Sequence, residues 1–286
     1  MNRIGVTANT AKPRAAEVLR RLACAARVRG IELFALEGTA RLTDGITALA
    51  PDDFYDRVEA LLALGGDGTM LRAVRELGGR DLPVMGLNLG SLGFLTSVQE
   101  NDMERALDAL ARGDYRLGTR RMVDCRVVRG ALEQGRFHAL NDVVIANGDS
   151  ARVITLGVDV DGERVTEYVC DGLIVSTPTG STGHSLSAGG PIVSPESCVF
   201  VLSLICPHTL SSRPIVIPDS CEVSVEVSES DAGVHMMVDG QVGQDLQPND
   251  RVSIRASERS VRFVHLPGYR YFAVLRHKLH WAGSVA

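Results

Sequence analysis

The segment whose residue types and spacing best suit chemistry is Leu64-Gly65-Gly66-Asp67-Gly68-Thr69. An apolar run ends in this turn, and a helical pattern follows through about Leu77, for which Thr69 can serve as the N-cap. Glycines let a ligand approach the backbone, and helix N-termini bind phosphate. In open α/β sheets, ligands bind beyond the carboxyl ends of strands. A plain turn capped by Asp67 is the alternative, but three glycines around one carboxylate at a strand end favour a phosphate-binding site.

Four further segments could contribute to a site. The glycine cluster 86–94 follows an apolar run, but glycine turns are common, so alone it is weak evidence. Asn141-Asp142 precedes the apolar run 143–145, and the pair could hydrogen-bond a base and a ribose or simply end a strand. The loop 171–191 is dense in hydroxyl groups and glycine, and its flanking strands and Pro178 favour a binding loop over a flexible linker. Segment 238–241, Val-Asp-Gly-Gln, could be only a hairpin turn.

Several common catalytic signatures are absent from the sequence. It contains neither G-x-x-x-x-G-K-[ST] nor G-x-G-x-x-G, which disfavours a P-loop kinase and a simple dinucleotide-dependent dehydrogenase. It contains no G-x-S-x-G, and its 7 histidines lack metal-ligand spacing, so we predict no metal site built from protein residues. Lys12 and Lys278 are the only lysines, so arginine, backbone N–H groups or a metal ion must contact any phosphate.

The composition is that of an ordinary globular chain, with 286 residues, 45% hydrophobic and 23% charged. The net charge of −5 argues against a nucleic-acid partner, which requires clustered basic residues. The 6 cysteines lie in apolar runs without a C-x-x-C pair, which predicts reduced core residues. The sequence shows neither a signal-peptide pattern nor an apolar run near the roughly 20 residues of a membrane helix, so we expect a cytoplasmic protein without a membrane partner.

The elements that must position these segments change character along the chain. Strand patterns alternate with helical ones over the first part, which predicts a parallel sheet covered on both faces. From about Gly118 strands follow strands, with strict alternation in 221–228 and a hairpin turn at Asp161-Gly162, which predicts a β-sandwich or barrel-like domain. A final strand, 261–266, precedes a helix within 269–281 whose apolar face must dock against another element.

Taken in order, these pieces resemble the NAD kinase family over nearly the whole chain. The resemblance rests on Asn9, the G-G-D-G-T at 65–69, Gly90-Ser-Leu-Gly-Phe94, Asn141-Asp142, the loop 171–191, Val238-Asp-Gly-Gln241 and Pro267-Gly268-Tyr269. It implies an N-terminal α/β domain, residues 1–118 with the returning chain end 262–286. It also implies a β-rich, sandwich-like domain, residues 119–261, with NAD in the cleft between the two.

The resemblance further implies a reaction and roles for residues. The ATP γ-phosphoryl group would be transferred, with Mg²⁺ or another divalent cation, to the 2′-hydroxyl of NAD's adenosine ribose, giving NADP. Asp67 would be the general base, and Gly65, Gly66 and Gly68 would hold the donor phosphates. NAD would contact Asn141, Asp142, Asp171, Thr182, Gly183, His184, Ser185, Leu186, Ser187 and Gln241, with Arg72 and Arg152 as phosphate contacts. Polyphosphate is an alternative donor, and a homodimer or homotetramer is expected.

The sequence departs from the family pattern in three places. Asp142 replaces the usual Glu, and Gly183-His184 replaces the usual Ala-Tyr, so that a smaller ring would stack on the dinucleotide. Two other functions stay open. Diacylglycerol and sphingosine kinases share the G-G-D-G motif, although the sequence shows no clear membrane-facing patch. A non-catalytic NAD(H)-sensing module would bind the dinucleotide without turnover, and the intact Asp67 argues against it.

Overall fold

The computed structural model describes residues 1–90, 93–148, 153–228 and 233–281. Contacts divide the chain into two compact units: unit 1 comprises Met1–Thr119 and Val261–Ala286, and unit 2 comprises Arg120–Ser260. Two long strands, β7 (Arg116–Arg129) and β18 (Asp250–His265), carry the chain between the units. The chain end therefore belongs to the first unit, which confirms the predicted return of the C-terminus to the α/β domain.

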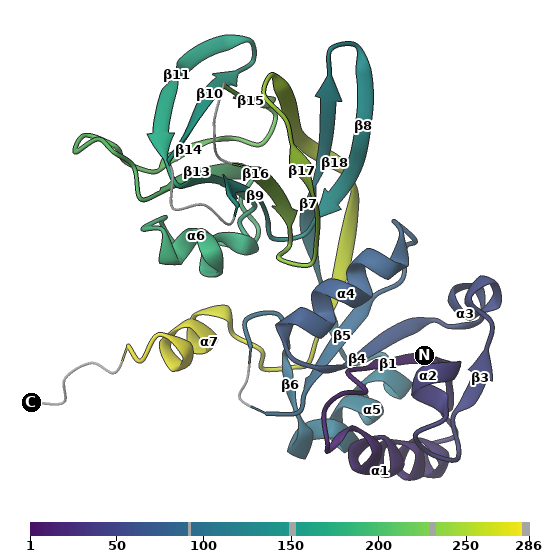
Figure 1. Ribbon diagram of the computed structural model, residues 1–286. Helices are drawn as coiled ribbons and strands as arrows, with labels where there is room; N and C mark the ends of the chain where they lie inside the picture. Colours follow the sequence, from purple (N-terminus) through teal and green to yellow (C-terminus); the bar gives the residue numbers. More distant parts are fainter. Residues whose placement is uncertain (91–92, 149–152, 229–232, 282–286) are drawn as a thin grey trace, which may run out of the picture. The chain divides into compact units, whose positions relative to one another are not determined.

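Unit 1 is built on a parallel sheet in the order β5-β4-β1-β2-β3, and β6 and the end of β18 also pair in parallel with β5 (Figure 1). The strands are β1 (Arg3–Ala8), β2 (Glu32–Leu36), β3 (Thr47–Leu49), β4 (Ala60–Gly65), β5 (Val84–Asn88) and β6 (Val98–Gln99). The helices are α1 (Ala15–Val28), α2 (Glu37–Ala40), α3 (Pro51–Arg57), α4 (Asp67–Leu77), η1 (Glu100–Asp102), α5 (Met103–Arg112) and α7 (Tyr271–Lys278).

The central strand β4 is buried along its whole length, and its side chains alternate between two helical layers. Leu62 and Leu64 belong to a core formed with α1 and α5. Leu61 points the other way, since a Cβ added at Gly5 would touch both Leu61 and Phe54 of α3. Figure 1 shows α1 and α5 on one side of the strands and α4 on the other. The predicted parallel sheet covered on both faces is therefore confirmed.

The predicted N-cap of α4 is wrong. The helix begins at Asp67, with Gly66 as N-cap in an extended conformation (φ −104°, ψ −166°) and no side-chain cap. Because the glycine adopts this conformation, the helix starts two residues before Thr69. Thr69 is consequently a buried residue of the first turn, and Asp67 stands at the start of the helix.

Unit 2 consists of two antiparallel layers around one core. One layer contains parts of β7 and β18 with β8 (Leu132–Ala139), β10 (Ile154–Val160), β11 (Glu163–Cys170) and β15 (Val223–Val227). The other has the order β14-β13-β12-β9-β16-β17, that is Ile215–Pro218, Val199–Ile205, Gly172–Ser176, Asp142–Asn147, Val234–Val238 and Val242–Leu246. Val225 of the first layer and Met236 of the second are fully buried in the same cluster, as the sandwich prediction requires.

Three smaller expectations can be compared with the structure. Asp161 and Gly162 join β10 to β11 with positive φ values of 51° and 81°, which confirms the predicted hairpin. All six cysteines are free, although Cys24, Cys198 and Cys206 are exposed rather than in the core. No helix within the described ranges is both long and apolar enough to span a membrane.

We predict that Gly86→Ala destabilises unit 1, because β5 must pass close to the segment that follows it. An added Cβ would lie 2.8 Å from Met70 Sδ and 2.9 Å from Thr96 Cα, and backbone cannot move as easily as a side chain. Overpacking of this kind costs about 1–3 kcal/mol in the free energy of unfolding. Gly38→Ala is the matched control, since a Cβ there meets nothing within 4 Å. Urea denaturation should separate the two, and equal midpoints would contradict the prediction.

Candidate functional site

The turn from β4 into α4 is closed on one side and open on the other. A Cβ added at Gly65 would lie 2.1 Å from Thr69 Oγ1, so only glycine fits against the first turn of the helix. A Cβ at Gly66 would meet no atom within 4 Å, and Gly68 is exposed. The start of α4 is therefore accessible to a ligand, as a phosphate site at a helix N-terminus requires.

Asp67 connects this turn to the segment after β5. Its carboxylate accepts hydrogen bonds from three consecutive backbone N–H groups: Phe94 at 2.9 Å, Leu95 at 3.0 Å and Thr96 at 3.3 Å. Gly93 precedes them, and a Cβ there would lie 1.9 Å from Asp67 Oδ1. The glycine cluster 86–94, weak evidence by itself, therefore includes a glycine that the Asp67 contact requires.

Two buried side chains, which the sequence did not single out, hold this segment from within. Asn88 ends β5, and its Nδ2 donates to Thr96 Oγ1 at 2.9 Å. The same Thr96 oxygen accepts the N–H of Gly93 at 2.9 Å, and Asn88 Oδ1 accepts the N–H of Gly90 at 2.7 Å. Asn88 lies inside the glycine cluster. An amide side chain at the end of a buried strand is the sequence signal that could have identified it as a structural residue of the site.

Arg72 lies along the end of β1 rather than on the glycine turn. Its Nη2 donates to the carbonyl oxygen of Ala8 at 2.8 Å, and its Nε lies 3.7 Å from the Glu76 carboxylate. The guanidinium is thus already oriented by the protein. Whether it contacts phosphate stays a prediction.

In unit 2, the backbone at Asn141-Asp142 is fixed by a carboxylate from the turn after β16. Asp239 accepts the N–H groups of Leu140 at 2.9 Å, Asn141 at 2.7 Å and Asp142 at 3.3 Å. Segment 238–241 is a hairpin turn, as expected, and Asp239 gives it this additional role. Asn141 Oδ1 is buried and has no hydrogen-bond partner among the described residues, which leaves it available to a ligand donor.

Asp142 is 5% exposed, and burial together with the nearby charge of Asp239 raises its pKa to about 7. The three N–H donors of this corner are directed at Asp239 and not at the Asp142 carboxylate. A buried carboxylate with a raised pKa is a common feature of ligand sites.

The hydroxyl-rich loop begins by closing onto the same corner. Thr177 donates from N to the carbonyl oxygen of Asn141 at 2.8 Å and from Oγ1 to that of Leu140 at 2.6 Å. A Cβ at Gly180 would lie 2.2 Å from the Asn141 oxygen, so glycine is needed for this approach. These contacts bring Asn141, Asp142 and the start of the loop together, and they argue against a flexible linker.

The rest of the loop folds into η2 (Gly180–Thr182) and α6 (His184–Ser187). Gly183, His184 and Ser187 are exposed, and Thr182 and Leu186 are half-buried. Ser185 is fully buried, with its hydroxyl 3.0 Å from that of Ser203. The predicted binding residues of this loop therefore divide into an accessible set and Ser185, whose hydroxyl is already bonded.

Three other predicted residues lie elsewhere. Asp171 precedes β12, and the register pairs Gly172 with Ala146 and Ser176 with Asp142. Asp171 is thus at the opposite end of this strand pair from Asp142, about 17 Å away at the usual rise per residue. Gln241 is half-buried in the β16–β17 turn, where its N–H donates to the Val238 carbonyl. Arg152 lies outside the described residues.

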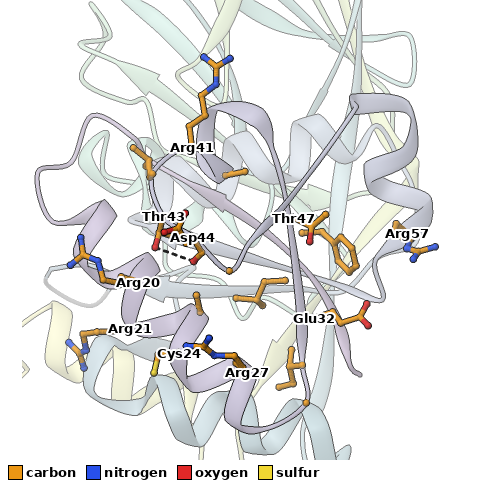
Figure 2. A pocket seen from close by; sticks show the side chains of 18 residues that line it. Arg20, Arg21, Cys24, Arg27, Glu32, Arg41, Thr43, Asp44, Thr47 and Arg57 are labelled. Carbon is orange, nitrogen blue, oxygen red and sulfur yellow. Dashed lines mark hydrogen bonds between the residues drawn. The ribbon is translucent and has the colours of Figure 1, made fainter.

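A hollow of about 1450 Å³ in unit 1 contains none of the predicted residues. It lies between α1 and the segment Ala40–Thr47, and Figure 2 shows arginines around it. The arginines are exposed, and they come from α1, from residue 41 and from α3 (Arg20, Arg21, Arg27, Arg41 and Arg57). Within the described residues, no three His, Cys, Asp or Glu side chains are grouped to hold a metal ion.

Comparison with known proteins covers both units. The family model for the ATP-NAD kinase N-terminal domain matches residues 4–115, and that for the C-terminal domain matches residues 140–266. The NAD kinase of Syntrophotalea carbinolica is 41% identical over 98% of this chain and 99% of its own length. The NAD kinase of Geobacter sulfurreducens is 40% identical over the same shares, 98% and 99%.

Two solved structures are also similar to the chain. The crystal structure of yeast NADH kinase complexed with NADH matches with a TM-score of 0.90 at 23% identity, covering 100% of this chain and 89% of that one. An NAD kinase from Archaeoglobus fulgidus, solved in complex with ATP, matches with a TM-score of 0.76 at 25% identity, covering 98% and 100%. The first likeness shows the common fold.

We predict that the ionisation of Asp142 lowers the free energy of unfolding as the pH rises. The native state keeps a proton that the unfolded chain releases between the ordinary pKa of 3.8 and the raised value of about 7. The loss of stability caused by Asp142 is therefore absent below pH 3.8 and largest above pH 7. Asp142→Asn should match the wild type near pH 4 and be more stable by up to about 4 kcal/mol at pH 8.

Urea unfolding across this pH range measures the effect of Asp142→Asn. Asp52→Asn, at an exposed position of α3, is the control and should change little at either pH. A constant difference between Asp142→Asn and wild type would show that Asp142 does not carry the proton.

Proposed function

The chain belongs to the NAD kinase family, a family of phosphotransferases, and on this premise we propose how its residues perform the reaction. The γ-phosphoryl group of ATP passes to the 2′-hydroxyl of the adenosine ribose of NAD, giving NADP, and Asp67 is the general base. The observation that carries this proposal is the carboxylate of Asp67, held by three backbone N–H groups at the accessible start of α4.

The bonds to Asp67 leave room for the incoming hydroxyl on one oxygen. A carboxylate has about four lone-pair sites. Leu95 and Thr96 both donate to Oδ1, whereas Phe94 alone donates to Oδ2. The oxygen bonded to Phe94 therefore has a site left to accept the hydrogen of the 2′-hydroxyl. The fixed carboxylate would orient the hydroxyl and take its proton, which is what phosphoryl transfer requires of a protein base.

A kinase that uses ATP requires a divalent cation, and we propose Mg²⁺. The described residues hold no cluster of acidic or His side chains for a resident ion. Mg²⁺ commonly binds substrate phosphates and waters with few protein ligands, so this residue set suits an ion that arrives with ATP. The ion would neutralise charge on the phosphates. Asp67, with three acceptor sites occupied, would remain the proton acceptor.

For NAD we propose the corner of unit 2 where Asn141 and Asp142 meet the hydroxyl-rich loop. Asn141 Oδ1 is buried without a partner, and Asp142 is a buried carboxylate with a raised pKa. Thr182, Gly183, His184 and Ser187 lie at the accessible surface of the adjoining loop. The side chains of Thr182, His184 and Ser187 and the backbone of Gly183 would contact the dinucleotide, and Ser185 would hold the loop in shape through Ser203.

Other parts of the assignment remain proposals. The domain boundaries 118/119 and 261/262 are supported by the two compact units. ATP as donor is supported by the Archaeoglobus fulgidus relative solved with ATP, and polyphosphate stays an additional candidate. A homodimer or homotetramer and a cytoplasmic location rest on the family resemblance and the sequence. A lipid kinase is not supported, because relatives of about 40% identity over nearly the full chain are NAD kinases.

We predict that Asp67→Asn lowers kcat by about 10²–10⁴-fold, the usual contribution of a positioned acid–base group, while the fold is kept. NADP formed from ATP, Mg²⁺ and NAD is measured with an NADP-specific dehydrogenase. Wild-type turnover in the variant would contradict the role of Asp67, and a folded wild type without turnover would favour an NAD(H)-sensing module.

Asn also changes the contacts to the loop, so a second variant separates the two effects. Gly93→Ala keeps the carboxylate but forces it apart from residues 94–96, because the added Cβ overlaps Asp67 Oδ1. Amide hydrogen exchange at residues 94–96 reports the loop in both variants. If Asp67 acts as a base, Asp67→Asn should be less active than Gly93→Ala even where residues 94–96 are equally protected from exchange in the two variants.

A further inference from the structure

The C-terminal helix α7, which follows β18 (Figure 1), brings one of the two lysines of the chain to the segment that binds Asp67. Lys278 is the last residue of α7, and its Nζ lies 5.9 Å from the centroid of the Phe94 ring. A cation within about 6 Å of an aromatic ring is attracted to its face. The N–H of the same Phe94 donates to Asp67 Oδ2 at 2.9 Å. Phe94 therefore links this lysine to the proposed base.

The chain end is anchored to the same part of unit 1 as the segment that binds Asp67. Ser97 directly follows that segment, and its Oγ donates to the Val264 carbonyl oxygen at 3.2 Å, near the end of β18. Leu275 of α7 is only 1% exposed, so the helix is docked by this face. Lys278 follows Leu275 by three residues and lies on the same side of the helix. Its position is therefore set by the packing of α7 as well as by the ring.

The ammonium group of Lys278 has no acidic partner. Within the described residues, no Asp or Glu oxygen lies within 4.0 Å of its Nζ. Lys278 is half-buried, whereas Arg276 and His277 of the same helical turn are exposed. A lysine presents three donors and a compact positive charge, which suit a phosphate group. This ammonium group is therefore available to an anion that arrives with the substrates.

The phosphate group closest to this position in the proposed reaction is the one that is transferred. The 2′-hydroxyl would be bonded to the Asp67 oxygen that also accepts the N–H of Phe94. Its proton passes to Asp67 while its oxygen forms a bond to the γ-phosphorus of ATP. The bond from that phosphorus to the bridging oxygen breaks, and ADP leaves with the electron pair. Lys278 would keep its three protons throughout and neutralise charge on the phosphoryl oxygens.

We propose that Lys278 contacts the phosphoryl group that is transferred, and that it holds the same group as the 2′-phosphate of NADP after the reaction. This inference rests on the proposed function, since it takes Asp67 as the base at the 2′-oxygen. It gives the site a lysine contact to phosphate, in addition to the arginine, backbone and metal contacts that are expected from the sequence. The lysine comes from the chain end, about two hundred residues from Asp67.

Calorimetric binding of NADP and of NAD tests this contact, because the two ligands differ only in the 2′-phosphate. Lys278→Met removes the charge and keeps most of the length of the side chain. It should weaken NADP binding about tenfold, the loss of one charge-assisted hydrogen bond. It should change NAD binding by less than about twofold, because NAD lacks the phosphate. The loss of NADP affinity should become smaller as the salt concentration rises.

Two other variants of α7 are the controls. Lys278→Arg keeps the positive charge and should retain most of the NADP affinity. Arg276→Met removes a positive charge from an exposed position of the same helical turn, and it should leave the binding of both ligands unchanged. In turnover, Lys278→Met should lower kcat and leave the KM for NAD nearly unchanged, because the phosphoryl group is not part of NAD.

The outcomes separate this inference from the proposed function. Selective weakening of NADP in Lys278→Met, with affinity retained in Lys278→Arg, would support the contact. Equal weakening of NAD and NADP would show an effect on the structure of α7 and would overturn the inference. NADP binding like that of the wild type, or the same selective loss in Arg276→Met, would also overturn it. A wild-type protein that binds neither ligand would contradict the proposed function itself.

Discussion

The contact on which the site depends is that of the Asp67 carboxylate with the N–H groups of Phe94, Leu95 and Thr96. It joins the end of β4 to the segment after β5 through one side chain and three backbone groups. Two glycines make it possible: Gly93 leaves space for the carboxylate, and Gly86 leaves space behind Thr96. The segment is thus held from both sides, and the carboxylate has one defined orientation before any substrate arrives. Preorganised groups of this kind need no rearrangement during the reaction.

Unit 2 uses the same chemistry for a different purpose. Asp239 accepts three consecutive N–H groups and thereby fixes the backbone of Asn141 and Asp142. Burial, together with the nearby charge of Asp239, raises the pKa of the Asp142 carboxyl. In each unit, a turn carboxylate orders a neighbouring segment by binding its backbone. The difference is that Asp67 is at the accessible start of α4, where we propose that it acts as the base, whereas Asp239 positions other residues.

Local patterns predicted much of this arrangement. The strand–turn–helix at 60–77, the parallel sheet and the antiparallel domain follow from periodicity and glycine placement, which are local properties. The partners of Asp67 could not be predicted, because Phe94 and Leu95 contribute backbone N–H groups that carry no residue-type signal. The start of α4 at Asp67 could not be predicted, because its N-cap is Gly66, which has no side chain to signal a cap. Ser185 resembles its exposed neighbours in type, and only its tertiary contact with Ser203 distinguishes it.

The most direct test of the central claim is a crystal structure of the protein with NAD and a non-hydrolysable ATP analogue. The Asp67 oxygen bonded to Phe94 should lie within about 2.6–3.2 Å of the 2′-oxygen of the adenosine ribose. The bonds from residues 94–96 to Asp67 should be retained in this complex. A complex in which the 2′-oxygen is bonded to Asp142 or another group, with Asp67 out of reach, would contradict the claim.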